Sequence, residues 1–452
     1  MKLNLLKEKK ILILGLGREG ESSFKFLRKQ FPKKTIGVAD QLNFNRLPDN
    51  IKKLIKKDKN TRFHLGKNYL KALKDYEIII KTPGVPLKIL APYLSKNQII
   101  TTQTDIFLEQ YAKQTIGITG TKGKSTTSSL IYQILKKAKK SVELIGNIGR
   151  PPLNFFGKKR DFFVFEMSCH QLQGLKISPK IAVFLNIYRD HLDYYRNFQE
   201  YFSARKNITY WQKEGDVFVF NYEMKKLRNL AKKTKALKIP FGVKNKKGCY
   251  LKNNWIYYEG KKIIPPEVIP LKGRHNLFNV MASVAVASLL GIKPKIIEKA
   301  IKEFKPLEHR LEFVGEFGGV KYYNDSIATI PEATIEAIKA LSDVETLILG
   351  GFERKQNFKN LLHFILKKKI KNLILLPETG KRIYKELQNI KKKWEPNCFL
   401  ANNMKEVIEI AKKVTKKGIC LLSPASASFG LFKDYRDRGE QFKKYLYEIS
   451  KK

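Results

Sequence analysis

The chain has 452 residues, 43% of them hydrophobic, which is enough for two or three domains with buried cores. Its net charge is +48, but the lysines are spread from end to end and no nucleic-acid motif accompanies them. A lysine-coated surface therefore explains the charge better than specific nucleic-acid binding does. No apolar run is long enough to span a membrane, so we expect no membrane insertion. The four cysteines lack CxxC spacing, which argues against zinc and disulfides and favours the cytoplasm.

The first hundred residues alternate short apolar runs with helical patterns, and we predict strands at 11–14, 35–39 and 77–80. The run GLGREG follows the first of these directly, and Asp40 lies twenty residues beyond its last glycine. That spacing is typical of a dinucleotide-binding turn, in which backbone N–H groups and a helix start hold a diphosphate. A dehydrogenase is one interpretation, but it leaves the next motif unexplained.

The run GITGTKGKST, residues 117–126, reads as a strand, a glycine-rich loop and a helix start. Its glycine spacing is shorter than that of a strict Walker motif, but the physics of the loop is the same. Small residues let backbone N–H groups converge on phosphates, Lys124 can neutralise their charge, and Ser125 can bind Mg²⁺. ATP is the cofactor that this loop predicts.

Two further buried strands each end next to side chains that can bind a metal. Glu166 ends the run DFFVFE, and His191 follows the run IAVFLNI. Because ligands bind at the carboxyl ends of parallel strands, we predict that both side chains lie near the phosphate loop.

Later segments predict a hairpin at 248–263, a helix at 276–292 and, after residue 309, paired strands followed by strand and helix patterns. We therefore predict an α/β protein with domains at 1–102, 103–306 and 307–452. The first and third are Rossmann-like, and the second is a phosphate-loop ATPase with a parallel sheet.

Together, nine motifs resemble the Mur ligases of peptidoglycan synthesis, most closely the branch that adds glutamate. In chain order they are GTKGKST, GNIG, EMSCHQL, LNIYRDHLDYY, ARKNI, GRHNLFNVMAS, HRLEFVG, NDSIAT and SPASASFGLFKDYRDRG. The resemblance implies a UDP-binding domain, a central ATPase and a C-terminal amino-acid-binding domain in a monomer. It also implies that ATP and Mg²⁺ activate the carboxylate of UDP-N-acetylmuramoyl-L-alanine as an acyl phosphate, which the amine of glutamate then attacks.

The resemblance also assigns residues to roles. The catalytic and metal set is Lys124, Ser125, Glu166, His191 and Lys206, of which Lys206 would have to be carbamylated to bind a metal. The remaining ATP contacts would be Gly120, Thr121, Gly123, Thr126, Asn276, Asn279, Arg310 and Asp325. The UDP-substrate contacts would be Gly15, Leu16, Gly17, Arg18, Asp40, Asn147, Ser168 and Gln171, and the glutamate contacts Thr329, Arg354, Ser428 and Tyr435.

Two positions depart from the family pattern. Ile327 stands where the family has a lysine, and Arg354 falls on the lysine of a neighbouring family motif, where its guanidinium could grip a carboxylate. A D-glutamate ligase is the preferred interpretation, and the same ligation with L-glutamate is the alternative. A folylpolyglutamate-synthase-like ligase is less favoured, because it does not explain the first domain. A nucleic-acid-stimulated ATPase would explain the charge of +48 but is also less favoured.

Overall fold

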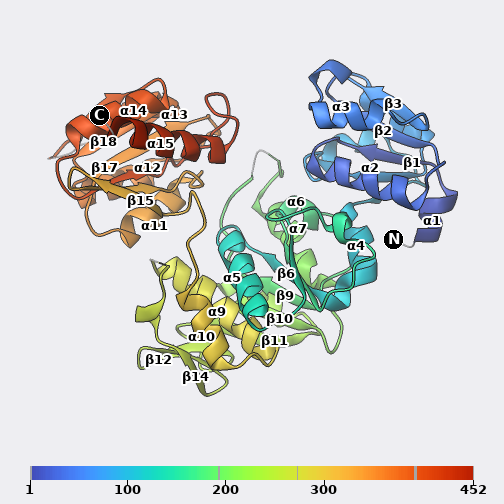
Figure 1. Ribbon diagram of the computed structural model, residues 1–452, viewed down its shortest axis with the longest axis horizontal. Helices are drawn as coiled ribbons and strands as arrows, with labels where there is room; N and C mark the ends of the chain where they lie inside the picture. Colours follow the sequence, from blue (N-terminus) through green and yellow to red (C-terminus); the bar gives the residue numbers. More distant parts are fainter. Residues whose placement is uncertain (1–2, 192–193, 272, 391–393, 451–452) are drawn as a thin grey trace. The chain divides into compact units, whose positions relative to one another are not determined.

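The computed structural model describes residues 3–191, 194–271, 273–390 and 394–450 (Figure 1). One compact unit holds residues 1–268 and 278–303, and another holds residues 269–277 and 304–452. Both are built from parallel-dominated sheets with helices, which confirms the α/β fold class. The predicted domain boundaries after residues 102 and 306 stay predictions.

The first sheet has the strand order β3-β2-β1-β4-β5, with every pair parallel. Its central strand, β1, is the run Ile-Leu-Ile-Leu and is buried along its whole length, as a parallel strand between helices must be. The strands are β1 (Ile11–Leu14), β2 (Ile36–Asp40), β3 (Thr61–Leu65), β4 (Ile78–Lys81) and β5 (Ile99–Thr101). The helices of this segment are α1 (Leu3–Glu8), α2 (Arg18–Gln30) and α3 (Asp49–Lys56).

The second sheet has the order β14-β13-β12-β11-β10-β9-β6-β8-β7 and is parallel from β7 to β12. Its strands are β6 (Thr115–Thr119), β7 (Val142–Gly146), β8 (Phe162–Glu166), β9 (Ile181–Phe184), β10 (Val217–Asn221), β11 (Leu237–Gly242), β12 (Cys249–Lys252), β13 (Trp255–Tyr258) and β14 (Lys261–Ile264). The antiparallel pair β12–β13 forms the predicted hairpin. The helices of this segment are α4 (Gln103–Tyr111), α5 (Lys124–Lys137), α6 (Cys169–Leu172), α7 (Phe198–Tyr210), α8 (Lys225–Ala231), α9 (Arg274–Leu289) and α10 (Pro294–Lys302).

This strand order positions the candidate site. Because β9, β6, β8 and β7 are neighbours and parallel, their carboxyl ends meet at one edge of the sheet. Strand β8 alone buries three aromatic or β-branched side chains, Phe163, Val164 and Phe165, at 0% exposure. Each contributes about 1.5–3 kcal/mol through burial, so the strand ends are held on a rigid core.

The third sheet lies in the second unit, with the order β15-β16-β20-β17-β18-β19. Its strands are β15 (Glu312–Phe317), β16 (Val320–Asn324), β17 (Val344–Gly351), β18 (Asn372–Glu378), β19 (Asn397–Leu400) and β20 (Ile419–Leu422). Its helices are α11 (Pro331–Ala340), α12 (Lys359–Lys368), α13 (Thr379–Gln388), α14 (Met404–Val414) and α15 (Tyr435–Ser450). The paired strands predicted after residue 309 are β15 and β16.

Candidate active site

The phosphate loop runs from the end of β6 to the start of α5, as predicted. Gly123 is the last loop residue and has a φ of +86°, in the left-handed region that favours glycine. A Cβ there would lie 2.2 Å from Oδ1 of Asn279 on helix α9. The glycine therefore lets α9 approach the loop closely, and Asn279, a predicted ATP contact, lies beside it.

The Lys124 ammonium lies over the same loop. Its Nζ donates hydrogen bonds to the carbonyl oxygens of Gly120 at 2.9 Å and Thr121 at 3.1 Å. Burial, together with the nearby Arg205 guanidinium, lowers the pKa of Lys124 to about 8. Ser125 and Thr126 follow in the first turn of α5, whose backbone N–H groups have no partner within the helix. This arrangement suits the phosphates of a nucleotide.

Glu166 ends β8 and is completely buried. Its Oε1 accepts a hydrogen bond from Nδ2 of Asn147 at 2.8 Å, whereas its Oε2 has no partner. A buried carboxylate oxygen without a partner is costly unless a cation completes it. Glu166 therefore fits Mg²⁺, with the Ser125 hydroxyl as a second ligand from the phosphate loop.

Asp190 and His191 follow β9 at the same edge of the sheet. Burial alone would raise the pKa of Asp190, but Lys122, 3.7 Å away, and His191 hold it at about 2. Burial lowers the pKa of His191, so its imidazole is neutral at pH 7, the form that binds metals. Asp193, a carboxylate two residues further along, lies outside the described residues.

Helix α7 carries Lys206, the predicted metal ligand, and next to it a buried arginine. Lys206 is half-buried, and its Nζ lies 5.8 Å from the centroid of the Phe202 ring. Arg205 is 1% exposed, and its guanidinium donates to Oγ1 of Thr119 at 2.6 Å. Arg205 also acts electrostatically on Lys124 and His191. Arg205 is thus hydrogen-bonded beside the phosphate loop, and the metal role of Lys206 stays a prediction.

The helix phase is the signal that identifies Arg205. Tyr201, Ala204, Arg205, Ile208 and Thr209 are the buried residues of α7. They recur at i, i+3, i+4, i+7 and i+8, the spacing of one helix face. Lys206 lies one residue, or about 100°, outside that stripe.

The glycine turn of the first sheet has the predicted geometry. Gly15 has a φ of +94°, and a Cβ there would lie 2.1 Å from Oγ1 of Thr82. Gly17 is the N-cap of α2. Asp40, at the end of β2, accepts the Leu16 N–H at 2.7 Å, so its carboxylate braces the turn from within the sheet.

Arg18, in the first turn of α2, reaches the loop after β7. Its guanidinium donates to the carbonyl oxygens of Gly146 at 2.6 Å, Asn147 at 3.2 Å and Gly149 at 3.3 Å. The structure therefore brings Arg18 and Asn147 together, two of the residues predicted to bind the UDP substrate.

Ser168 and Gln171 form a capping box at the start of α6. The Gln171 side chain also donates to Oε1 of Glu19 at 2.6 Å. Burial raises the pKa of Glu19 and lowers the pKa of the neighbouring Lys81 to about 8. Sequence reasoning missed Glu19 and Lys81. The signal for Glu19 was its place inside GLGREG, and the signal for Lys81 was its place directly after the strand predicted at 77–80.

In the second unit, Asp325 and Ser428 lie on loops that follow β16 and β20. Asp325 accepts hydrogen bonds from the Leu311 N–H at 3.3 Å and from Oγ of Ser423 at 2.9 Å. Ser428 is buried, and the Thr329 carbonyl accepts a hydrogen bond from the Gln356 side chain at 2.8 Å. Asp325, Ser428 and Thr329 are thus held by contacts within this unit.

Arg438, which the sequence analysis did not single out, ties these loops together. It is 0% exposed and donates to the carbonyl oxygens of Ser326 at 2.7 Å, Ser426 at 3.1 Å and Ala427 at 3.2 Å. Burial lowers its pKa to about 9, so it is charged at pH 7 and its burial depends on these acceptors.

We expect Arg438→Met to lower the free energy of unfolding by about 3 kcal/mol or more, because three buried carbonyls lose their donor. Urea unfolding of the full chain measures the change. Arg436→Met is the matched control, since Arg436 is exposed on the same helix. Equal effects of the two substitutions would contradict this role.

The other predicted residues of this unit have separate surroundings. Arg354 is exposed, with its guanidinium 5.4 Å from the Phe429 ring centroid. Tyr435 is the first residue of α15, and its carbonyl accepts a hydrogen bond from Oγ of Ser326 at 2.7 Å. Nε of Arg310 is buried without a partner, and Asn276 is buried in the first turn of α9.

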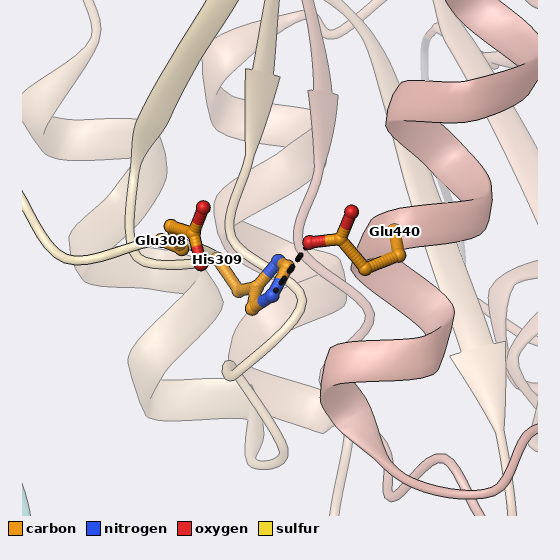
Figure 2. A group of neighbouring side chains, drawn as sticks. All are labelled: Glu308, His309 and Glu440. Carbon is orange, nitrogen blue, oxygen red and sulfur yellow. Dashed lines mark ion pairs between the residues drawn. The ribbon is translucent and has the colours of Figure 1, made fainter.

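Figure 2 shows a group beside Arg310 in which Glu308, His309 and Glu440 bring three possible metal ligands together. Nε2 of His309 lies 3.4 Å from Oε1 of Glu440. Nζ of Lys443 lies 2.9 Å from Glu440 and 3.5 Å from Glu308. Because the Lys443 ammonium already supplies the positive charge that a metal would bring to these carboxylates, we interpret this group as an ion-pair network.

The first sheet, the phosphate loop and the carboxylate at a neighbouring strand end define a class: α/β proteins that bind phosphorylated ligands at strand ends. Two family models match the chain, "Mur ligase middle domain" over residues 118–287 and "Mur ligase, glutamate ligase domain" over residues 309–426. The chain belongs to the Mur ligase family. No helix among the described residues is long and apolar enough to cross a membrane.

Individual relatives agree with this assignment. A UDP-N-acetylmuramoylalanine–D-glutamate ligase from Caldanaerobacter subterraneus is 34% identical over 98% of this chain and 99% of its own. The ligase of the same name from Clostridium tetani is 34% identical over 97% of this chain and 96% of its own. Among solved structures, the alanine ligase MurC of Thermotoga maritima has a TM-score of 0.61 at 18% identity, covering 98% of this chain and 100% of its own. MurF from the same organism, solved with ADP, also has a TM-score of 0.61, at 19% identity, covering 98% of this chain and 97% of its own. At these identities the two structures support the fold alone.

Proposed function

We propose that this chain joins D-glutamate to UDP-N-acetylmuramoyl-L-alanine in an ATP- and Mg²⁺-dependent reaction in the cytoplasm. The observation that carries the proposal is the pairing of a phosphate-loop lysine, Lys124, with a buried carboxylate, Glu166, whose Oε2 lacks a partner. Relatives at 34% identity along nearly the whole chain carry the name of this activity.

The chemistry has two steps. The substrate carboxylate attacks the γ-phosphorus of ATP, the bond from that phosphorus to the bridging oxygen breaks, and ADP leaves. The glutamate amine then attacks the acyl phosphate carbon, loses a proton and expels inorganic phosphate, which leaves an amide. A carboxylate is a poor acyl donor, so the first step supplies the leaving group.

The residues of the chain align and neutralise the reactants. Lys124 and the N–H groups of the first turn of α5 bind the phosphate oxygens of ATP. Ser125 and Glu166 would hold Mg²⁺, which would supply a positive charge beside the phosphates. Asn147 positions the Glu166 carboxylate through the 2.8 Å hydrogen bond to Oε1. Gly17, the N-cap of α2, offers its backbone N–H to the diphosphate of the UDP-sugar, while Asp40 accepts the Leu16 N–H and so braces that turn.

The test of the proposed function is turnover by the purified chain with UDP-N-acetylmuramoyl-L-alanine, ATP, Mg²⁺ and each glutamate enantiomer separately. We expect phosphate release and amide formation with D-glutamate. Turnover with L-glutamate alone would support the L-specific alternative, which Ile327 and Arg354 motivate. Turnover with neither enantiomer would remove the proposed function.

Arg354 is proposed to bind a carboxylate of the incoming glutamate. Its guanidinium is exposed and lies against the Phe429 ring, so it is free to form a bidentate ion pair with a carboxylate. We expect Arg354→Ala to raise the KM for glutamate about 10-fold or more, with little change in the KM for ATP. Lys355→Ala is the control, because Lys355 is its exposed neighbour. Equal changes in the two KM values would argue against this contact.

A further inference from the structure

We infer that Arg205 supplies a fixed positive charge at the reacting phosphoryl group, in the place where a second metal ion held by a carbamylated lysine was expected. The inference deepens the proposed function and rests on it for the identity of the reactants. In this inference Arg205 is a catalytic residue and Lys206 is a lysine outside the reaction centre. Ser125 and Glu166 then form the site of a single Mg²⁺.

The position of the Arg205 guanidinium supports this inference first. The Arg205 Nη1 donates to Thr119 Oγ1 at 2.6 Å, and that hydroxyl donates to the Met167 carbonyl at 2.9 Å. Thr119 immediately precedes the phosphate loop, and Met167 immediately follows Glu166. The guanidinium is therefore joined through one hydroxyl to the ends of β6 and β8, which carry the two main groups of the candidate site.

Burial and unused hydrogen-bonding capacity are the second argument. Arg205 is 1% exposed and its Nε has no hydrogen-bond partner. Burying a cation with an unused donor is unfavourable unless an acceptor completes it, and an anionic oxygen of the substrate would do so. The guanidinium also lies 4.8 Å from the Tyr201 ring centroid, and Tyr201 in turn shares a hydrogen bond with Oγ1 of Thr121 at 2.9 Å. These contacts fix the plane of the guanidinium without neutralising its charge.

The charge of Arg205 supports this inference in a third way. The Arg205 guanidinium and the His191 imidazole both lie beside the Tyr201 ring, at 4.8 and 6.2 Å from its centroid. A cation that already acts on His191 opposes the binding of a second metal ion to that imidazole. Phosphoryl transfer builds negative charge on oxygens that a guanidinium can bind bidentately, so Arg205 can take over the neutralising task of such an ion.

Adjacent substitutions on α7 separate the two hypotheses. We expect Arg205→Met to lower kcat by about 100- to 1,000-fold, whereas Lys206→Met stays within about twofold of the wild type. We also expect guanidinium ions to restore part of the activity of Arg205→Ala, and acetate to restore none. Loss of activity in a Lys206 variant that acetate restores would overturn the inference, because that result identifies a carbamate. If Arg205→Met fails to fold, Arg205→Lys serves instead, with a loss of at least about 10-fold expected, since an ammonium cannot bind two oxygens in one plane.

Metal counting tests the inference without the peptide-forming reaction. Mn²⁺ in place of Mg²⁺ can be counted by electron paramagnetic resonance on the wild-type chain saturated with ADP and inorganic phosphate. We expect one Mn²⁺ per chain, with and without added bicarbonate. Two ions per chain would overturn the inference. Failure of the proposed function would appear separately, as absence of turnover with either glutamate enantiomer while the metal count is unaffected.

Discussion

Replacing Lys124 with methionine is expected to lower kcat by about 100- to 1,000-fold, the usual effect of removing one donor to a developing charge. The lysine Nζ donates to the carbonyl oxygens of Gly120 and Thr121, so it is held over the phosphate loop. A methionine fills a similar volume and offers no charge. Steady-state kinetics with the UDP-substrate, ATP and glutamate measure the loss.

The same substitution should leave the fold intact. The pKa of Lys124 falls from 10.5 in the unfolded chain to about 8 in the folded one, mainly through burial. A lysine with a lowered pKa opposes folding below pH 8, and this penalty fades as the pH rises from about 8 through 10.5. At pH 7 the methionine variant should therefore have a thermal midpoint no lower than that of the wild type.

The control for Lys124 lies at the other end of the same helix. Lys137 is in the last turn of α5 and forms an ion pair with Glu303 on the surface. We expect Lys137→Met to keep kcat within about twofold, since exposed ion pairs contribute little. Comparable losses in the two variants would show that the charge of Lys124 has no special role.

The strand-end parts of the site could be predicted because local sequence determines them. An apolar run precedes Gly120 and a helix signal follows it, so the loop must connect a buried strand to the start of a helix. The structure shows this connection between β6 and α5. Glu166 was predictable in the same way, because a buried parallel strand carries its final residue to the ligand edge.

The parts of the site that lie on helices were harder to predict, because an error of one residue in the position along a helix rotates the side chain by about 100°. Lys206 matched a motif by counting residues from His191, but the buried stripe of α7 passes through Arg205 instead. The interactions of Glu19 and Lys81 depend on residues from distant segments, such as Gln171. Arg438 likewise binds carbonyls more than ten residues away in the chain. No local pattern encodes such contacts.

Glu166→Gln is the second substitution with a large expected effect, and it tests the Mg²⁺ site directly. The amide keeps the shape of the side chain but cannot supply a charged oxygen to the metal. We expect kcat to fall about 100-fold or more at a fixed Mg²⁺ concentration, with a higher Mg²⁺ concentration needed for half-maximal activity. Activity measured across a Mg²⁺ titration gives both numbers.

Stability distinguishes this metal role from a structural one. Glu166 is completely buried, with one oxygen bound to Asn147 and the other without a partner, so its charge costs folding energy. Neutralising it should leave the thermal midpoint of the metal-free chain unchanged or higher, while the stabilisation that Mg²⁺-ADP gives the wild type is reduced. Glu143→Gln, on the neighbouring strand β7 and paired with Arg160, is the control and should retain that stabilisation. A Glu166→Gln chain that Mg²⁺-ADP stabilises as strongly as the wild type would show that this carboxylate does not hold the metal.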